Sequence, residues 1–240
     1  MDGGQNFIKK NGRYKYYNLI VRNVAKTKRK GEYPMSQYDN YEVEYWPDIT
    51  LELVRNHPLE PELIIDVVFE AWNGIMETSI ANQLRIGRDI FPQPQILGNY
   101  LHELIPAILA SRYPNLWRRE RDKCDKDLVY IPNVDYSVEI KTSSNPTNIY
   151  GNRSYGQENS ENNSGKSKDG YYLTINFEKF DPSNPDFRPN INIIRFGWVD
   201  HSDWHAQAAA TGQQATLSRE ARDNKLLTIY RRGLIDMRRE

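Results

Sequence analysis

The apolar positions of the chain first follow the period of a helix and later the period of a strand. Between residues 60 and 84 they recur three and four positions apart, and Pro61 suits a first helical position. Gly74 weakens the middle of this segment, so it is either one helix or two. A second apolar stripe predicts a helix over 97–112. Pro106 lies inside it and must either kink the helix or mark its true start.

Short segments rich in β-branched and aromatic residues follow these two helices and predict strands. They are 116–120, 127–131, 136–142, 171–177 and 191–199. Pro132 lies between the second and third of them, in a stretch typical of a hairpin turn. A further helix is expected over 206–230, with a break at Gly212. This order predicts an α/β (α+β) fold in which helices flank a mixed β-sheet.

The chain has 240 residues, a length that fits a single domain. The 38% of hydrophobic residues suffices for a core, and no apolar run is long enough to span a membrane. The N-terminus lacks a secretion signal. The single cysteine, Cys124, excludes an internal disulfide framework and a cysteine-rich zinc finger. We therefore expect a cytoplasmic protein.

Charge is balanced overall, with 32 basic and 32 acidic residues, which excludes a bulk polycation. The charges are nevertheless unevenly distributed. Residues 1–30 hold nine Lys or Arg and one acid, whereas residues 32–77 hold eleven acids and one base. The basic N-terminal run is either a solvated arm or a surface that contacts phosphates, and the sequence leaves both interpretations open.

One group of charged residues in the predicted sheet suggests chemistry. Side chains of a strand alternate between faces, so Glu139 and Lys141 share one face while Ile140 points to the other. A hairpin turn at Pro132 brings the start of the preceding strand, where Asp127 lies, close to Glu139 or Lys141. Two carboxylates can bind Mg²⁺, and a neighbouring lysine can orient or deprotonate a water molecule. This combination suits the hydrolysis of a phosphodiester.

The pattern Glu-x-Lys by itself is ordinary on the exposed face of a strand. What distinguishes it here is the apolar strand around it, the acid twelve residues upstream and the preceding helix, which carries Glu103. Together, Asp127 and the tripeptide Glu139-Ile140-Lys141 resemble the signature of the PD-(D/E)XK nucleases, although Lys126 replaces the usual proline. The predicted order of elements resembles the αβββαβ core of that superfamily.

Three further segments resemble type II restriction endonucleases of the ScaI type: 136–144, 151–157 and 168–176. The resemblance covers about residues 97–200 and leaves residues 1–95 unplaced. It implies that Asp127, Glu139 and Ile140 are metal ligands for Mg²⁺ and that Lys141 activates water. Glu103 resembles the helix-borne acid of the superfamily, although it could equally be a solvated helix residue. Asp125 competes with Asp127 for the role of the first ligand.

The resemblance also implies contacts with DNA, from the crossover that follows the catalytic strand. Asn, Arg and Gln side chains read base edges or bind phosphates, and the polar loop beyond them is able to fold on DNA. The expected DNA-binding residues are Asn152, Arg153, Ser154, Tyr155, Gln157, Lys166 and Lys168. The sequence Asp-His-Ser-Asp-Trp-His at 200–205 has the residue types of a metal site, but a satisfied loop is the favoured interpretation.

The resulting hypothesis is a type II restriction endonuclease that cuts double-stranded DNA at a short palindromic site, using Mg²⁺, as a homodimer. We expect one domain. It has a helical and basic N-terminal part (1–95) for dimerisation and DNA contact, a nuclease core (97–200) and a helical C-terminal part (201–240). The helix over 60–84 is either a dimer face or plain core. The alternatives are a structure-specific repair or recombination nuclease and an inactive DNA-binding protein on the same scaffold.

Overall fold

The computed structural model describes residues 36–156, 167–184, 186–206 and 214–233. The chain from Gln37 onward forms one compact unit. The basic run at 1–30 lies outside the described residues, as does most of the polar loop, 157–166. Within the described part of the chain, no helix is long and apolar enough to cross a membrane.

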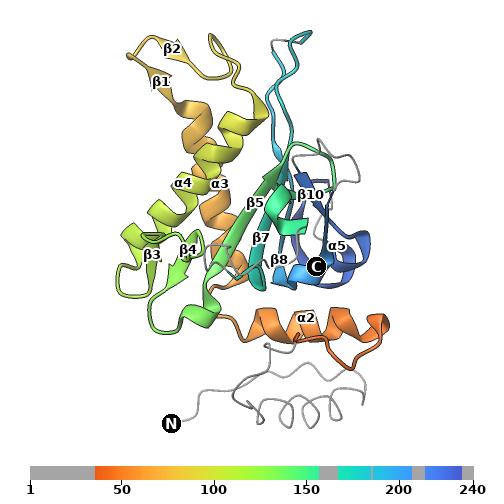
Figure 1. Cartoon of the computed structure of the whole chain (residues 1–240). Helices are drawn as coiled ribbons and strands as arrows, with labels where there is room; N and C mark the ends of the chain where they lie inside the picture. Colours follow the sequence, from red (N-terminus) through yellow and green to blue (C-terminus); the bar gives the residue numbers. More distant parts are fainter. Residues whose placement is uncertain (1–35, 157–166, 185, 207–213, 234–240) are drawn as a thin grey trace, which may run out of the picture. The chain divides into compact units, whose positions relative to one another are not determined.

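A six-stranded mixed sheet forms the centre of this unit (Figure 1), with the strand order β11-β8-β7-β5-β4-β3. Its strands are β3 (Trp117–Arg119), β4 (Leu128–Tyr130), β5 (Val138–Ser143), β7 (Gly170–Phe177), β8 (Ile191–Val199) and β11 (Leu226–Arg231). Only β5 and β7 run parallel, and every other neighbouring pair is antiparallel. The five strands predicted from the sequence are confirmed. A 3-10 turn, η2 (Val134–Tyr136), occupies the predicted hairpin turn.

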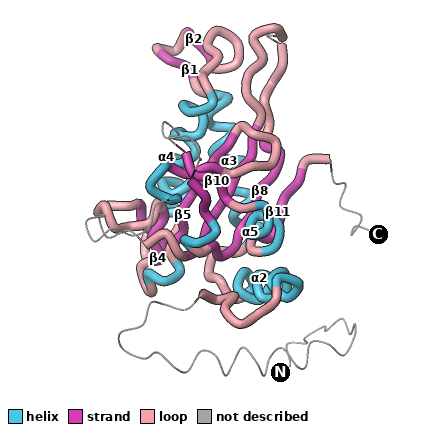
Figure 2. Tube along the Cα trace, turned by 45° about the vertical axis from the view of Figure 1, so that its right-hand side comes forward, coloured by secondary structure: helices cyan, strands magenta, loops and turns pink. Residues whose placement is uncertain are grey.

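Two long helices, α3 (Pro61–Glu77) and α4 (Pro94–Arg112), cover one face of the sheet (Figures 1 and 2). Pro61 stands in the first turn of α3, as predicted. Both helices contribute buried side chains to the main apolar core together with the sheet, so the apolar stripe of α3 is core. Pro106 lies inside α4, which begins twelve residues earlier at Pro94.

The expected helix over 60–84 is too long, because the chain leaves the helical path after Glu77. A small hairpin follows, formed by β1 (Ser79–Ile80) and β2 (Leu84–Arg85). Ala81 and Asn82 between these strands have φ angles of 54° and 56°, which lie in the left-handed region and are incompatible with a helix. Gly74 does not divide the helix, which runs through it without interruption.

A smaller layer packs on the opposite face of the central sheet. It contains β6 (Tyr150–Asn152), the 3-10 turn η3 (Arg153–Gly156), β9 (Trp204–Ala206), β10 (Gln214–Leu217) and α5 (Arg219–Asn224). The strands form a sheet of order β6-β10-β9. Side chains of this layer join Tyr172, Val199 and Leu226 of the central sheet in a second apolar cluster.

The expected C-terminal helix over 206–230 is wrong. Residues 214–231 form a strand, a helix of six residues and another strand. The side chain of Ser218 accepts a hydrogen bond from the Ala221 N–H and so caps α5, whereas β11 pairs antiparallel with β8. Gly212, the expected break, lies outside the described residues.

The chain before α3 adds η1 (Val43–Tyr45) and α2 (Trp46–Arg55), which were not predicted. Helix α2 contacts β8 and β11 and lies across one end of the central sheet (Figure 1). The last 3-10 turn, η4 (His201–Asp203), follows β8 directly.

Candidate active site

Strand β5 carries the predicted catalytic tripeptide between the two apolar clusters. Val138 and Ile140 are fully buried in the main core. Glu139 and Lys141 lie on the opposite face, in register with Tyr172 and Thr174 of β7. The predicted alternation of faces is therefore confirmed, but this face is covered: Glu139 is only 2% exposed.

Asp127 immediately precedes β4 and lies beside this tripeptide. Strands β4 and β5 pair at Leu128 and Val138. Two residues further along β5, the Ile140 N–H donates a hydrogen bond of 2.7 Å to Oδ2 of Asp127. A side-chain carboxylate thus takes the place of a backbone partner at the edge of β5. The hairpin brings Asp127 to the catalytic strand, as the sequence predicted.

Glu139 receives two short contacts on a single oxygen. Its Oε1 atom lies 2.6 Å from Nζ of Lys141 and also accepts a 2.6 Å hydrogen bond from the hydroxyl of Tyr155. The Lys141 ammonium stands over the ring of Tyr155, 4.8 Å from its centroid. Burial, reinforced by the negative charge of Glu139, raises the pKa of Tyr155 far above its usual range, so its hydroxyl stays protonated.

Helix α4 presents His102 to this site, and not Glu103. Nδ1 of His102 lies 3.6 Å from Oδ2 of Asp127. Glu103 is 64% exposed on its side chain and forms an ion pair with Arg119 of β3. The structure therefore does not bring Glu103 together with the other predicted residues.

The docking of α4 on β5, combined with helical periodicity, explains why His102 and not Glu103 reaches the site. Gly98 approaches β5 so closely that a Cβ atom added there would lie 2.6 Å from Oγ1 of Thr142. His102 follows Gly98 by four residues and therefore shares its face of the helix, whereas Glu103 is turned by about 100° away.

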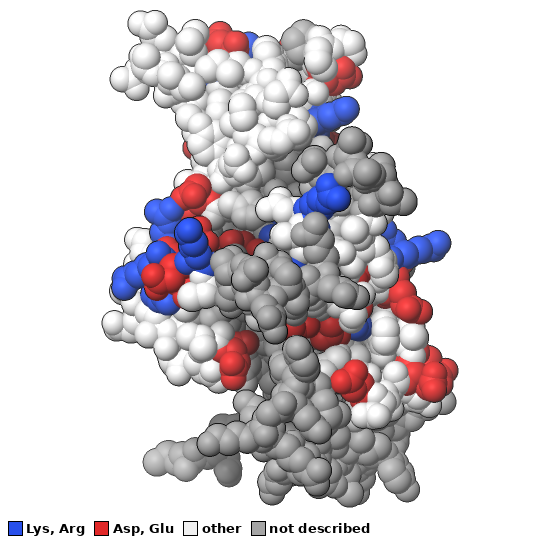
Figure 3. All heavy atoms as spheres, viewed as in Figure 1, with Lys and Arg blue, Asp and Glu red and all other residues white. Residues whose placement is uncertain are grey.

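Asp125, the competing first ligand, is committed to a turn. Its carboxylate binds the Arg118 guanidinium through both oxygens, at 2.7 and 3.1 Å, and accepts the N–H groups of Arg121 and Asp122. The hydrogen bonds from Arg118 hold the pKa of Asp125 well below its usual range. Figure 3 shows basic and acidic side chains mixed on the surface beside β3 and β4, in line with these pairs. Asp127 is thus the acid that reaches β5.

The predicted DNA-binding segment lies next to the active site. Asn152 and Arg153 are exposed, and Ser154 is half-buried. The ammonium of Lys168 donates to the carbonyl of Ser154, and burial lowers the pKa of this lysine. Tyr155 does not share the exposed position of its neighbours, because it is buried against Glu139. Gln157 and Lys166 lie outside the described residues.

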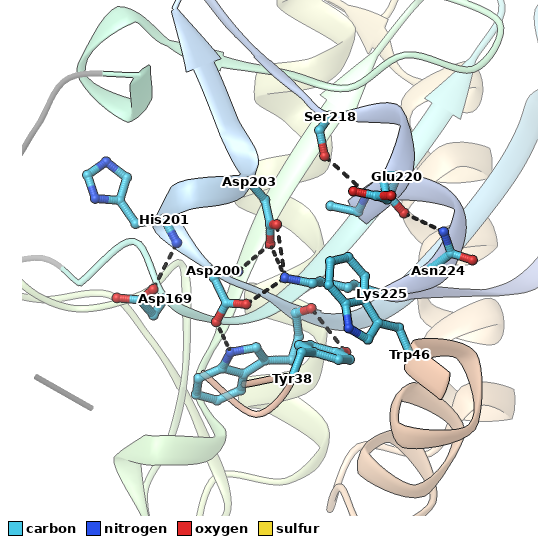
Figure 4. A network of polar contacts seen from close by, with 12 residues as sticks. Tyr38, Trp46, Asp169, Asp200, His201, Asp203, Ser218, Glu220, Asn224 and Lys225 are labelled. Carbon is cyan, nitrogen blue, oxygen red and sulfur yellow. Dashed lines mark hydrogen bonds and ion pairs between the residues drawn. The ribbon is translucent and has the colours of Figure 1, made fainter. Parts of the chain in front are cut away.

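The segment 200–205 forms η4 and the start of β9, and its two aspartates are engaged within the fold, which agrees with the structural interpretation favoured from the sequence. Asp200 and Asp203 both bind the buried ammonium of Lys225, at 2.7 and 2.9 Å (Figure 4). The rings of Tyr38 and Trp46 lie against the same ammonium, with centroids at 4.6 and 4.3 Å. These two carboxylates are therefore engaged by a cation that belongs to the chain itself.

The donor chemistry of the site suits a hard divalent cation. Among the residues that the structure describes, no three His, Cys, Asp or Glu side chains cluster as a ready metal site. Asp127 nevertheless accepts the Ile140 N–H, and Glu139 precedes Ile140 in the chain, so two carboxylates belong to this part of β5. The N–H and C=O of one strand residue point to the same edge, so the Ile140 carbonyl also faces the Asp127 side. These three groups are the oxygen donors that could hold Mg²⁺.

Comparison with known proteins agrees with this arrangement. Residues 36–230 match the ScaI restriction endonuclease family. A curated relative, the type II restriction enzyme ScaI of Streptomyces caespitosus, is 42% identical over 198 residues, which cover 82% of this chain and 86% of the relative. The chain therefore belongs to the ScaI restriction endonuclease family and is a type II restriction endonuclease, an enzyme that acts on DNA.

Proposed function

We propose that the enzyme hydrolyses phosphodiester bonds of double-stranded DNA at a short palindromic site with Mg²⁺, leaving 5′-phosphate and 3′-hydroxyl ends. One observation carries this proposal: the hydrogen bond from the Ile140 N–H to Asp127, which holds the second carboxylate beside Glu139 and Lys141. A repair nuclease that reads DNA structure is not favoured, because the chain belongs to a restriction endonuclease family.

Asp127, Glu139 and the Ile140 carbonyl would hold the cation. When bound, Mg²⁺ neutralises charge on the phosphoryl group and makes a water molecule more acidic. The hydrogen bond from Ile140 orients the Asp127 carboxylate. Glu139 is fixed by Lys141 and Tyr155. Outer contacts of this kind are typical of ligating carboxylates.

Lys141 is the residue proposed to act on the attacking water. Its Nζ lies 2.6 Å from Oε1 of Glu139, and 13% of the side chain is exposed to solvent. As the ammonium, Lys141 can orient the water through a hydrogen bond and stabilise charge on the phosphoryl oxygens. To act as the base it must first release a proton, after which the neutral amine can accept the proton of the water. Water then attacks phosphorus in line, and the 3′ oxygen leaves.

Recognition of DNA is proposed for the exposed residues where β6 meets η3 and for Lys168 beside them. Asn152 and Arg153 have the donors needed to read base edges or to bind phosphates. The described part of the chain carries one such catalytic patch. Cutting both strands of a palindrome therefore calls for two chains related by a two-fold axis.

Incubation with supercoiled plasmid and a long viral DNA in the presence of Mg²⁺ tests this proposal. We expect discrete fragments from the wild type and none from Asp127→Asn or Glu139→Gln. Both variants should still bind DNA in Ca²⁺, and sequencing of the fragment ends would give the site and the stagger.

Fragments from Glu139→Gln at the wild-type rate would contradict the proposed ligand set. Binding of DNA by the wild type without cleavage in Mg²⁺ or Mn²⁺ would instead favour an inactive binding protein. Arg153→Ala separates recognition from chemistry: unchanged rates at every site would remove η3 as a reader of DNA.

A further inference from the structure

The turn η3 contains a residue that faces away from the proposed DNA contacts and into the catalytic strand. Asn152 and Arg153 are exposed, whereas Tyr155, two residues later, is buried and 8% exposed. Its hydroxyl donates to Oε1 of Glu139 at 2.6 Å. Its ring lies under the ammonium of Lys141, 4.8 Å from the centroid. One side chain therefore contacts both charged residues of the catalytic tripeptide.

The position of Tyr155 is fixed by its surroundings. Its ring packs on Trp204 of β9, with centroids 5.0 Å apart. A Cβ atom at Gly151 would lie 3.1 Å from Cγ of Tyr155, so a larger residue there would press on the ring. At Gly156 a Cβ atom would collide with the backbone of Ala206. Glycines on both sides of Tyr155 thus allow η3 to pack closely against β9.

We propose that Tyr155 is a positioning residue that orients Glu139 and Lys141 and links the DNA-contacting turn η3 to the catalytic strand. This inference rests on the proposed function, in which Glu139 is a metal ligand and Lys141 acts on water. The hydroxyl is a strong donor to a carboxylate. It restrains Glu139, and the ring restrains the Lys141 ammonium through a cation–π contact.

Two substitutions separate these roles. Tyr155→Phe removes the hydroxyl and keeps the ring, whereas Tyr155→Leu removes both. The matched control is Tyr38→Phe, because the Tyr38 hydroxyl is also buried and bonds a side chain, Oγ1 of Thr50, at 2.8 Å. Glu139→Gln provides the reference for loss of the metal ligand itself.

The first readout is Mn²⁺ binding, measured from the free ion by electron paramagnetic resonance. The second is the single-turnover cleavage rate at saturating metal, and the third is DNA affinity in Ca²⁺. We expect Tyr155→Phe to weaken Mn²⁺ binding about tenfold, within the range of outer-contact losses. Tyr155→Leu should weaken Mn²⁺ binding as well, and its single-turnover rate should be lower than that of Tyr155→Phe. DNA affinity should stay unchanged in both, and Tyr38→Phe should match the wild type in all three readouts.

Equal Mn²⁺ binding by Tyr155→Phe and Tyr38→Phe would overturn the inference. So would a loss of DNA affinity at unchanged Mn²⁺ binding, because Tyr155 would then be an ordinary DNA contact. The Glu139→Gln arm distinguishes failure of the proposed function. If that variant also binds Mn²⁺ like the wild type, the proposed metal site is wrong; if it alone loses binding, only the role of Tyr155 is wrong.

Discussion

At the scale of single residues, the active site is organised by what surrounds its two carboxylates. The Asp127 carboxylate is held by a backbone N–H and lies close to an imidazole, whereas the Glu139 carboxylate is held by an ammonium and a phenol. Each carboxylate is therefore oriented by partners from a different element. Because such outer contacts fix the direction of the oxygen atoms, they influence the affinity of the site for a cation.

His102 offers a prediction at this scale. Its Nδ1 atom is 3.6 Å from Asp127, too long for a hydrogen bond but within reach of a small adjustment on binding. We expect His102→Ala to raise the half-saturating Mg²⁺ concentration for cleavage about tenfold. Titration of the cleavage rate with Mg²⁺ measures this.

Glu103→Gln provides the opposing arm of the same titration. If the helix-borne acid supports catalysis, this variant should show the loss and His102→Ala should not. That result would restore the role expected from the sequence. Because Glu103 is exposed and paired with Arg119, we expect the loss in His102→Ala and not in Glu103→Gln.

At the scale of elements, one buried cation joins segments that are distant in the sequence. Lys225 lies between α5 and β11 and is 3% exposed. It binds Asp200 at the end of β8 and Asp203 in η4, and it contacts Trp46 at the start of α2 (Figure 4). Burial raises the pKa of Asp203, and Lys225 opposes this rise, so the carboxylates depend on the cation.

Substitution of this lysine should destabilise the fold. Lys225→Met leaves two buried carboxylates without their cation, which typically costs about 3–5 kcal/mol. Arg219→Met is the control, because Arg219 forms an exposed pair with Asp223 and should contribute under about 1 kcal/mol. Urea unfolding of both variants at pH 7.5 measures the difference, and equal losses would contradict a structural role for the Lys225 cluster.

A buried histidine leads to a prediction about pH. Nδ1 of His57 accepts the Leu59 N–H, and Nε2 lies 3.0 Å from the Tyr136 carbonyl. A carbonyl only accepts, so Nε2 carries the proton and the ring is neutral. Burial lowers the pKa of His57 from 6.5 to about 4. As pH falls below 6.5, the unfolded chain binds a proton that the folded chain does not.

The folded state should therefore lose roughly 3 kcal/mol between pH 6.5 and pH 4 through this residue. Chemical unfolding of the wild type and of His57→Gln across this pH range isolates the effect, because the variant does not titrate there. The free energy of unfolding of the wild type should fall more steeply. Parallel curves would show that His57 does not carry this dependence.

At the scale of the whole molecule, the catalytic strand is enclosed between two apolar clusters. Ile140 belongs to the core that α3 and α4 cover, whereas Tyr155 and Tyr172 belong to the cluster beneath the small sheet. Glu139 accepts a hydrogen bond from Tyr155 of this second cluster and is itself buried. The small layer thus encloses the proposed catalytic residues and carries the proposed DNA contacts at the same time.

The proposed homodimer, with one catalytic patch in each chain, predicts the behaviour of mixed dimers. Wild type and Glu139→Gln, co-expressed with different tags and purified on both, should form dimers with one active subunit. Such a preparation should nick supercoiled plasmid at the recognition site and linearise it much more slowly than the wild type. Agarose gels resolve the nicked and linear forms. Direct linearisation at the wild-type rate would contradict one active site per chain.

The sequence alone determined five of the six strands of the central sheet and the position of the proposed catalytic tripeptide. Alternation of apolar and polar residues fixes the face of each strand side chain, so Glu139 and Lys141 had to share one face. The hairpin also placed Asp127 beside them, because the connection between the two strands is short. These features are local in sequence, and local patterns therefore predict them.

Only the tertiary structure decided which residues surround this tripeptide. His102 and Tyr155 reach it from a helix and from a turn, and no local pattern states how either element docks on the sheet. The C-terminal segment was predicted as a helix but became strand β11, because its pairing partner β8 precedes it by some thirty residues and long-range hydrogen bonding overrode local preference. Contacts between distant segments thus completed a site whose core the sequence already contained.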